Sequence, residues 1–339
     1  MNPRELHPAS WRRLLDWRAR LPHALLLAGQ RGVGKTDLAR AFAAGLLCEA
    51  PQAHDEACGV CVACRWFAQG QHPDFRLLAP EALCPASGEA EKSTRAGQDI
   101  TIAQVRELDD FLAVGAHRRG LRVILLHPAE TLNRAAANAL LKILEEPPES
   151  VLFLLVSSEP MLLLPTLRSR CQTLPIPLPD AALTLRFLRD ARVPDAEAWL
   201  ALAGGAPELA RQLAEGTSLD WLDVLTRALE SGGQLEVIAA ASALERKLKA
   251  VKGGNPLPQA MESAQKWLVD LNLAARELPI RFYLRQRAKI AALADVAHPV
   301  ALARFYRQSL EWRRESEHPL NMCLFLERFF FRYRSLFVK

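Results

Sequence analysis

The residues with the clearest chemical potential form a glycine-rich stretch, GQRGVGKT, at residues 29–36. It fits the pattern G-x-x-x-x-G-K-S/T, in which glycines let a loop curl so that backbone N–H groups point at a phosphate. Lys35 adds a positive charge, and the hydroxyl of Thr36 can coordinate magnesium. The residues expected to bind a nucleotide are Gly29, Gly32, Val33, Gly34, Lys35 and Thr36. The alternative is a glycine-rich turn that contains Lys-Thr by chance.

Hydrolysis of ATP needs more than a phosphate-binding loop. A motor protein also places a carboxylate at the end of a second buried strand, where it holds magnesium, usually beside an acid that positions water. The candidate strand is RVILL, residues 122–126, and His127 and Pro128 follow it. Imidazole is a poor ligand for a hard cation, and proline has no side-chain acceptor. The sequence therefore predicts a chain that holds phosphate without cleaving ATP, unless Glu130 or Glu145 replaces the missing acid.

Four of the seven cysteines lie close together in the sequence, as Cys48, Cys58, Cys61 and Cys64. A C-x-x-C-x-x-C core with one thiol upstream can place four thiolates about 2.3 Å from a zinc ion in a closed tetrahedral site. Such a site has no open coordination position, so the predicted zinc is structural. His54 or His72 could replace Cys48 as the fourth ligand, and a set of small buried thiols is the metal-free alternative.

The composition is that of an ordinary folded protein, with 50% hydrophobic and 24% charged residues in 339. The formal net charge of +5 is a mild excess that permits contact with nucleic acid without requiring it. The N-terminus lacks the apolar segment of a secretion signal, and the long apolar stretch 151–165 is interrupted by Glu159 and Pro160. We therefore expect a cytoplasmic protein without a membrane span, in which clustered cysteines favour metal over disulfides.

Strand and helix patterns alternate around these residues. Apolar runs typical of strands buried on both faces occupy residues 24–28, 122–126 and 151–156. Helical repeats occupy residues 37–48, 100–113 and 131–146. At least three alternations within about 170 residues imply a parallel sheet that is covered on both faces. A nucleotide would bind at the carboxyl ends of its strands.

The second half of the chain is predicted to be helical. A proline cluster at 175–179 marks a linker, beyond which no strand pattern is convincing. Residues 180–215 predict short helices, and 218–339 predict longer amphipathic ones. The last helix, 320–337, is apolar around most of its circumference, so we expect it to pack into other helices or other subunits, with a core helix of a monomeric bundle as the alternative. The expected fold class is α/β followed by all-α.

Taken together, these features resemble the delta-prime family of bacterial DNA polymerase III clamp-loader subunits. The resemblance is carried by the P-loop, the four cysteines, NALLKILEEPPE at 138–149, the SRC triplet at Ser169–Cys171 and the ending HPLNMCLFLERFFFRY at 318–333. It spans nearly the whole chain and is strongest between residues 23 and 175.

The resemblance implies an AAA+ protein of three domains. These are a RecA-like P-loop domain at 1–178 with a zinc-binding insertion at 48–64, a small helical lid at 179–217 and a helical collar at 218–339. The implied partners are gamma or tau and delta subunits in a ring of five, and through this complex the sliding clamp and primer-template DNA. The implied cofactors are structural zinc and, as an open question, ATP with magnesium, because some members of the family have lost the P-loop pattern.

Two departures separate this chain from the motor subunits that it resembles. Motors carry Asp-Glu where this chain has His127-Pro128, and they place a sensing arginine in the lid where GGAPELAR has Glu208, with Arg211 a turn later. Both departures are typical of a non-hydrolysing subunit. The spacing between the first two cysteines is one residue wider than is usual in the family, which leaves the assignment of Cys48 open.

Arg170 is the catalytic residue that the resemblance implies. In this family the arginine of the SRC triplet points at the gamma-phosphate of a neighbouring subunit, as an arginine finger supplied in trans. A planar guanidinium stays charged and can bridge several phosphate oxygens as charge builds up in the transition state. The alternative for Arg170 is an internal ion pair.

Three functions therefore compete. The preferred one is a non-hydrolysing clamp-loader subunit that helps load the sliding clamp during DNA replication and supplies Arg170 to a neighbouring ATPase. The others are an active AAA+ ATPase and a zinc-dependent DNA-binding protein whose P-loop is a relic.

Overall fold

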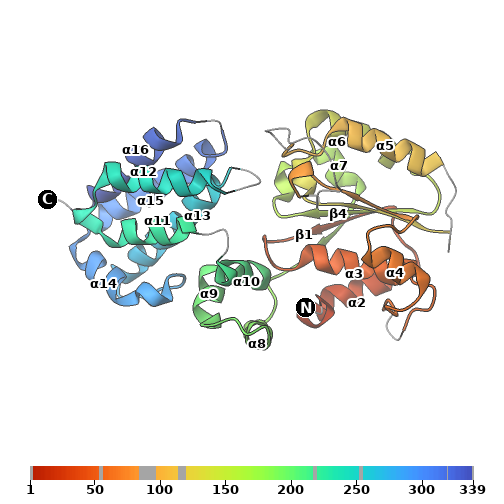
Figure 1. Ribbon diagram of the computed structural model, residues 1–339, viewed down its shortest axis with the longest axis horizontal. Coiled ribbons are helices and arrows are strands. Elements are labelled where there is room, and N and C mark those ends of the chain that lie inside the picture. Colours follow the sequence, from red (N-terminus) through yellow and green to blue (C-terminus); the bar gives the residue numbers. More distant parts are fainter. Residues whose placement is uncertain are drawn as a thin grey trace. The chain divides into compact units, whose positions relative to one another are not determined.

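The computed structural model describes residues 3–52, 56–83, 97–113, 120–216, 220–251, 255–318 and 320–337. The chain divides into two compact units, Met1–Phe187 and Leu188–Lys339. The first combines a parallel sheet with helices, and the described part of the second is helical (Figure 1). The predicted succession of α/β and all-α regions is confirmed. No helix in the described ranges has the length and hydropathy to cross a membrane.

The first unit is built on a sheet of five parallel strands in the order β2-β3-β4-β1-β5. The strands are β1 Ala24–Ala28, β2 Phe75–Leu78, β3 Arg122–Leu126, β4 Val151–Ser157 and β5 Gln172–Pro175. The three central strands are those predicted from apolar runs. The two edge strands were missed because FRLL and QTLP are short and partly exposed, so they carry no continuous apolar signal.

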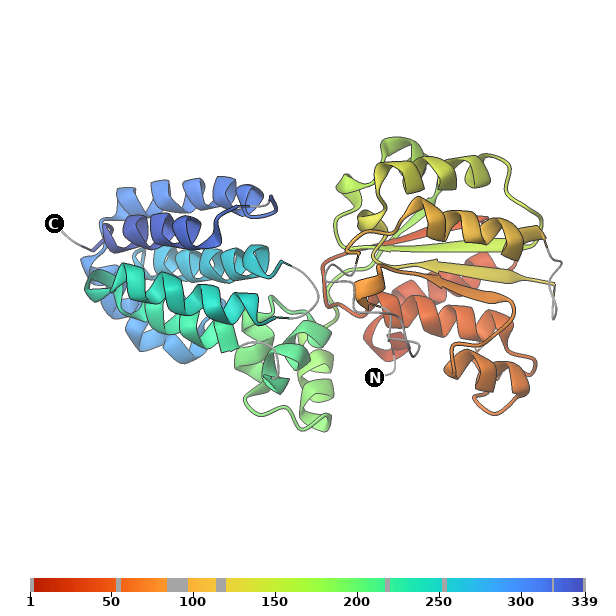
Figure 2. The ribbon, with the colours of Figure 1, turned by 45° about the horizontal axis from the view of Figure 1, so that its top comes forward.

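Helices cover both faces of this sheet. They are α1 Pro3–Leu6, α2 Pro8–Arg18, α3 Lys35–Leu47, α4 Val62–Ala68, α5 Ile102–Ala113, α6 Arg134–Glu145 and α7 Pro165–Arg170, with short 3-10 turns η2 Glu81–Leu83, η3 Ala129–Thr131 and η4 Pro160–Leu162. Helices α2 and α3 lie on one face, and α5 and α6 lie on the other (Figure 2). Helix α6 begins where the side chain of Asn133 accepts a hydrogen bond from the N–H of Ala136, at 2.8 Å.

The second unit is a bundle of helices. Helix α8 Ala181–Asp190 crosses the boundary, and α9 Ala196–Leu202, α10 Pro207–Glu215, α11 Asp220–Glu230, η5 Gly232–Gln234, α12 Val237–Lys249, α13 Leu257–Ala274, η6 Leu284–Gln286, α14 Arg287–Val296, α15 Pro299–Glu315 and α16 Met322–Arg334 follow. The predicted boundary between lid and collar at 217/218 falls on residues outside the described ranges and stays a prediction.

Aromatic side chains fill the core of the helical unit. The indole Nε1 of Trp267 donates to the hydroxyl of Tyr333 at 2.9 Å, and that hydroxyl donates to the carbonyl of Leu229 at 2.6 Å. Both polar atoms are thus satisfied inside an apolar environment. Helix α16 contributes Tyr333 and Phe329 to this core, while Phe331 stays 49% exposed. The last helix therefore packs mainly into helices of its own unit.

A buried carboxylate holds the connection between α13 and η6. Asp270 is fully buried, and its two oxygens accept hydrogen bonds from the backbone N–H groups of Arg281, Phe282 and Tyr283, at 2.7 to 3.2 Å. The ring of Tyr283 then meets the indole of Trp267 edge to face, with centroids 5.1 Å apart. Asp270 thereby satisfies three backbone donors in a segment that has left the helix.

We predict that Asp270→Asn lowers the free energy of unfolding by about 2 kcal/mol, because an amide group offers one acceptor where the carboxylate offers two charged oxygens. Urea denaturation followed by circular dichroism measures this change. Asp295→Asn is the matched control, since Asp295 is an exposed residue of α14 and should leave the midpoint of unfolding unchanged. Equal midpoints for the two variants would contradict the role assigned to Asp270.

Candidate functional site

The glycine-rich loop joins β1 to α3 and depends on its glycines. Gly32 and Gly34 have positive φ angles of 78° and 92°, a conformation in which a side chain is strained. Gly29 has no room for a side chain, because a Cβ atom would lie 2.3 Å from the carbonyl oxygen of Ile176. Val33 is fully buried. The loop therefore has the tight backbone that phosphate binding requires.

Lys35 folds back over this loop. Its ammonium group donates to the carbonyls of Gly29 and Gln30, both at 2.7 Å, and to the hydroxyl of Ser158 at 3.1 Å. The residue is only 4% exposed, and burial lowers the pKa of Lys35 to about 8. Ser158 directly follows β4, so the lysine connects the loop to the neighbouring strand in the sheet.

His127 lies beside Thr36, the residue expected to hold magnesium. The Thr36 hydroxyl is 3.2 Å from Nε2 and 3.3 Å from Nδ1 of His127, so it can bond one ring nitrogen at a time. Burial lowers the pKa of His127, and the charges of Lys35 and Arg31 act in the same direction. The residue after β3, where a motor protein has a carboxylate, is thus an imidazole that contacts the Thr36 hydroxyl.

The two acids considered as substitutes are placed differently. The carboxylate of Glu130 accepts a hydrogen bond from the N–H of Ser158 at 3.0 Å, and its charge raises the pKa of both Lys35 and His127. Its second oxygen, Oε2, is buried and has no hydrogen-bond partner within the described part of the chain. Glu145 instead forms an ion pair with Arg170. Of these two acids, only Glu130 therefore lies close to the glycine-rich loop.

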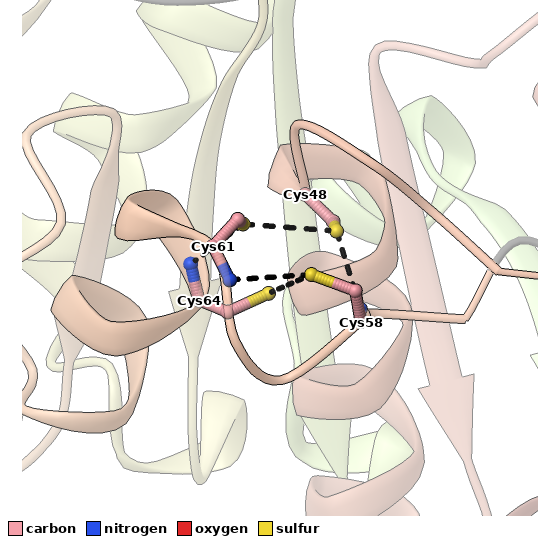
Figure 3. Close-up of side chains that lie close together, drawn as sticks. All are labelled: Cys48, Cys58, Cys61 and Cys64. Atoms are coloured by element: carbon pink, nitrogen blue, oxygen red, sulfur yellow. Dashed lines mark hydrogen bonds between the residues drawn. The ribbon is translucent and has the colours of Figure 1, made fainter.

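The four cysteines come together around one point (Figure 3). Their sulfur atoms all lie within 4.8 Å of one another, and the Cys48–Cys61 and Cys58–Cys64 sulfur pairs are each 3.9 Å apart. Four ligands at the usual zinc–sulfur distance in a tetrahedron stand about 3.8 Å apart. The cluster therefore has the dimensions of a closed zinc site.

Backbone N–H groups point at three of these sulfurs. The N–H groups of Cys58, Cys61 and Cys64 point at the sulfurs of Cys48, Cys58 and Cys61, at 3.2, 3.3 and 3.4 Å respectively. The N–H groups of Val60 and Cys61 lower the pKa of Cys58, which favours the thiolate that binds metal.

The structure also bears on which residue is the fourth ligand. Cys48 follows the last residue of α3 and lies in the cluster with the other three thiols. His72 is buried elsewhere, where its Nδ1 accepts a hydrogen bond from the N–H of Asp74 at 3.1 Å. His54 lies outside the described residues. Among the described residues, Cys48 therefore completes the set.

Arg170, at the end of α7, has an internal partner. It donates to Glu145 at 2.6 Å and to the carbonyl of Thr166 at 2.9 Å. The side chains of Arg170 and Glu145 are 34% and 52% exposed, and exposed pairs of this kind stabilise a protein by less than about 1 kcal/mol. The guanidinium can thus leave this partner at little cost.

In the helical unit, the charges at the expected sensor position pair with one another. Arg211 donates to both oxygens of Glu208, at 2.7 and 3.2 Å, and forms a second ion pair with Glu215 on the same helix, α10. The hydrogen bond and charge of Glu208 raise the pKa of Arg211 further above its usual range. Arg211 is therefore paired with Glu208 and is not a free cation at this position.

Residues 14–180 match the family described as DNA polymerase III, delta subunit. DNA polymerase III subunit delta' of Pseudomonas aeruginosa is 46% identical over 204 residues, which cover 59% of this chain and 58% of the relative. The subunit delta' of Escherichia coli K12 is 35% identical over 225 residues, or 64% and 63% of the two chains.

The chain belongs to the delta-prime family of DNA polymerase III subunits. The alignments span somewhat more than half the length of these delta-prime relatives. A solved structure, a DNA polymerase III gamma subunit-related protein from Thermotoga maritima, covers 96% of this chain and 99% of its own with a TM-score of 0.51 and 16% identity. At that identity the likeness concerns the fold alone, and it agrees with the predicted RecA-like AAA+ architecture.

One residue of the site was missed by sequence reasoning. Ser158 contacts both Lys35 and Glu130, through its hydroxyl and its N–H respectively. The available signal was its position, because it is a polar residue directly after an apolar strand that pairs with β1. Residues at the carboxyl ends of neighbouring parallel strands meet at one edge of the sheet.

We predict that Cys61→Ser reduces bound zinc from about one ion per chain and lowers the melting temperature by roughly 5 °C or more, because a structural zinc contributes to folding. Zinc content is measured by mass spectrometry of the purified protein. Cys323→Ser is the matched control, since Cys323 lies in α16 of the other unit and should keep the zinc. Full zinc content in Cys61→Ser would contradict the site.

We also predict that phosphate binding at the loop weakens as pH rises through about 8, where Lys35 loses its proton. Affinity for ADP should fall by up to about tenfold per pH unit above this value, because only the ammonium form attracts phosphate. Calorimetric titration with ADP at a series of pH values measures the slope. An affinity that does not change across this range would show that the charge of Lys35 contributes little.

Proposed function

We propose that this protein is a delta-prime-type subunit of a clamp loader, which helps to place a sliding clamp on primed DNA and does not itself hydrolyse ATP. The observation that carries the proposal is the contact between Thr36 and His127. In a motor subunit this position holds magnesium through a carboxylate. Here the hydroxyl faces an imidazole, while the loop and Lys35 keep the form of a phosphate site.

The lid supports the same conclusion. A motor needs a free cation there to follow the state of the nucleotide, whereas Arg211 is held by Glu208 and Glu215. The pairs leave a net negative group on α10, which disfavours a nearby phosphate. Two separate positions, His127 and Glu208, thus depart from what hydrolysis requires.

We further propose that Arg170 acts on a nucleotide bound by a neighbouring subunit. The end of α7 presents its guanidinium at a partly exposed position, where Glu145 holds it by a single exposed ion pair. A γ-phosphate carries more negative charge than one carboxylate and can accept two parallel hydrogen bonds from the same fork. Exchange of Glu145 for phosphate is therefore favourable once the neighbour is in place.

The remaining assignments belong to this proposal. We propose structural zinc at the cysteine cluster, partners of the gamma or tau and delta type, and a cytoplasmic location that follows from replication. Contact with the clamp and with DNA would be made through the assembled complex.

A second candidate, an active ATPase, is favoured by one observation. Glu130 places a carboxylate beside Lys35 and leaves one buried oxygen without a hydrogen-bond partner in the described ranges. Such a group can in principle position water. An ATPase assay on the isolated chain separates the two proposals: turnover that is lost in Lys35→Ala favours the enzyme, and turnover no faster than that of Lys35→Ala favours the non-hydrolysing subunit.

We predict that Arg170→Ala leaves ring assembly intact and abolishes turnover at the single interface that Arg170 serves, because an arginine finger accelerates phosphoryl transfer about a thousandfold or more. The ATPase rate of the reconstituted complex should fall by the fraction of the total turnover that this one interface contributes. Gel filtration reports assembly, and phosphate release reports turnover.

Two controls accompany this experiment. Arg168→Ala removes an arginine from the same helix and should keep the rate, because Arg168 donates to the carbonyl of Pro160 within its own unit. Glu145→Gln removes the negative charge that pairs with Arg170 but keeps the guanidinium, so it should also keep the rate. An unchanged rate in Arg170→Ala would reject the arginine-finger role, and loss of assembly in that variant would assign Arg170 a structural role instead.

A further inference from the structure

The contact between Thr36 and His127 bears on which ion, if any, accompanies the nucleotide. In P-loop proteins magnesium is held by the hydroxyl that follows the lysine and by a carboxylate at the end of a nearby strand. Here that hydroxyl lies 3.2 and 3.3 Å from the two nitrogens of His127, the first residue after β3. The imidazole thus lies against the one P-loop oxygen that would bind the metal.

The surroundings of His127 do not suit magnesium. The ion prefers six oxygen ligands in nearly octahedral geometry, and imidazole nitrogen suits softer metals. Burial lowers the pKa of His127, and the charges of Lys35 and Arg31 act in the same direction against the opposing charge of Glu130. The two positive charges also repel a further cation. The residues present therefore fit a phosphate better than they fit a metal–phosphate complex.

Glu130 is the one described carboxylate that acts on both Lys35 and His127. Its Oε1 accepts the N–H of Ser158 at 3.0 Å, and its Oε2 is buried without a hydrogen-bond partner in the described ranges. Magnesium completes its octahedron with waters and phosphate oxygens, but the P-loop hydroxyl that would join them is here bonded to imidazole. The charge of Glu130 is explained instead by the buried ammonium of Lys35, which it balances.

We propose that this P-loop binds the phosphates of a nucleoside diphosphate or triphosphate without a divalent cation. Lys35, the charge of Arg31 and the N–H groups that begin α3 then attract the phosphates, aided by the dipole of that helix. This inference rests on the phosphate-binding part of the proposed function and specifies the chemical form of the ligand. It does not depend on how the subunit assembles with its partners.

Calorimetric titration of the 339-residue chain with ADP tests the proposal, because ADP is not consumed. One buffer contains excess magnesium, and the other is freed of divalent ions over a chelating resin, so that no soluble chelator competes for the zinc. The dissociation constant without magnesium should lie within about twofold of the value with it or be lower. Lys35→Ala should weaken binding at least about tenfold in both buffers.

Two variants at the site give opposite expectations. His127→Asp supplies the carboxylate that a motor has, so magnesium should now strengthen ADP binding by about tenfold or more. Glu130→Gln removes a negative charge near the phosphates but also lowers the pKa of Lys35 further. It is therefore compared with the wild type at about pH 6, where Lys35 stays protonated, and should bind ADP there at least as tightly in both buffers. Zinc content and melting temperature confirm that each variant is folded.

Three outcomes would overturn the inference. The first is wild-type binding that strengthens about tenfold with magnesium and loses this gain in Glu130→Gln, which would assign the ion to Glu130. The second is the same gain retained in Glu130→Gln, which would place the ion elsewhere in the loop. The third is ADP binding in neither buffer. Ring assembly, measured separately by gel filtration, would still report on the subunit role in each case.

Discussion

The parallel pairing of β1 with β4 and of β4 with β3 is the constraint on which the candidate site depends. Ala28 stands opposite Ser157, and Leu126 stands opposite Leu155. Since all three strands run in the same direction, the residues that follow them emerge at one edge of the sheet. The glycine-rich loop, Ser158 and His127 thus meet, although Gly29 and Ser158 are 129 positions apart in the chain.

Burial at this edge gives each charged group a defined partner. Lys35 is held by two carbonyls and a hydroxyl, and Glu130 balances its charge. A buried ammonium without such partners would be costly to fold. The arrangement is therefore consistent as a structure even before any nucleotide is considered, while its missing strand-end carboxylate separates it from a motor.

Much of this could be predicted from the sequence, because the strongest signals are local. The apolar runs that form β1, β3 and β4 have no polar interruption, and the G-x-x-x-x-G-K-T pattern defines its own loop. The short spacing of Cys58, Cys61 and Cys64 also predicted the cluster, whereas the place of Cys48 in it was left open by the sequence and is seen in the structure. The edge strands β2 and β5 carry no such signal, because half or more of their residues are exposed.

The place of Glu130 depends on the turn η3 and on the register of β4, and the choice of Glu145 as partner of Arg170 depends on how α6 meets α7. These are tertiary facts that no local pattern contains.

Helix α3 links two features that are usually considered separately. Its first turn begins at Gly34 and Lys35 in the phosphate-binding loop, and its last residue, Leu47, precedes Cys48 in the thiol cluster. Thirteen residues make a rod about 20 Å long, with the glycine-rich loop at one end and the thiol cluster at the other. Because a helix is stiff along its axis, a shift of the four-cysteine cluster along that axis would also move the glycine-rich loop. The cluster therefore fixes how far α3 can slide beneath that loop.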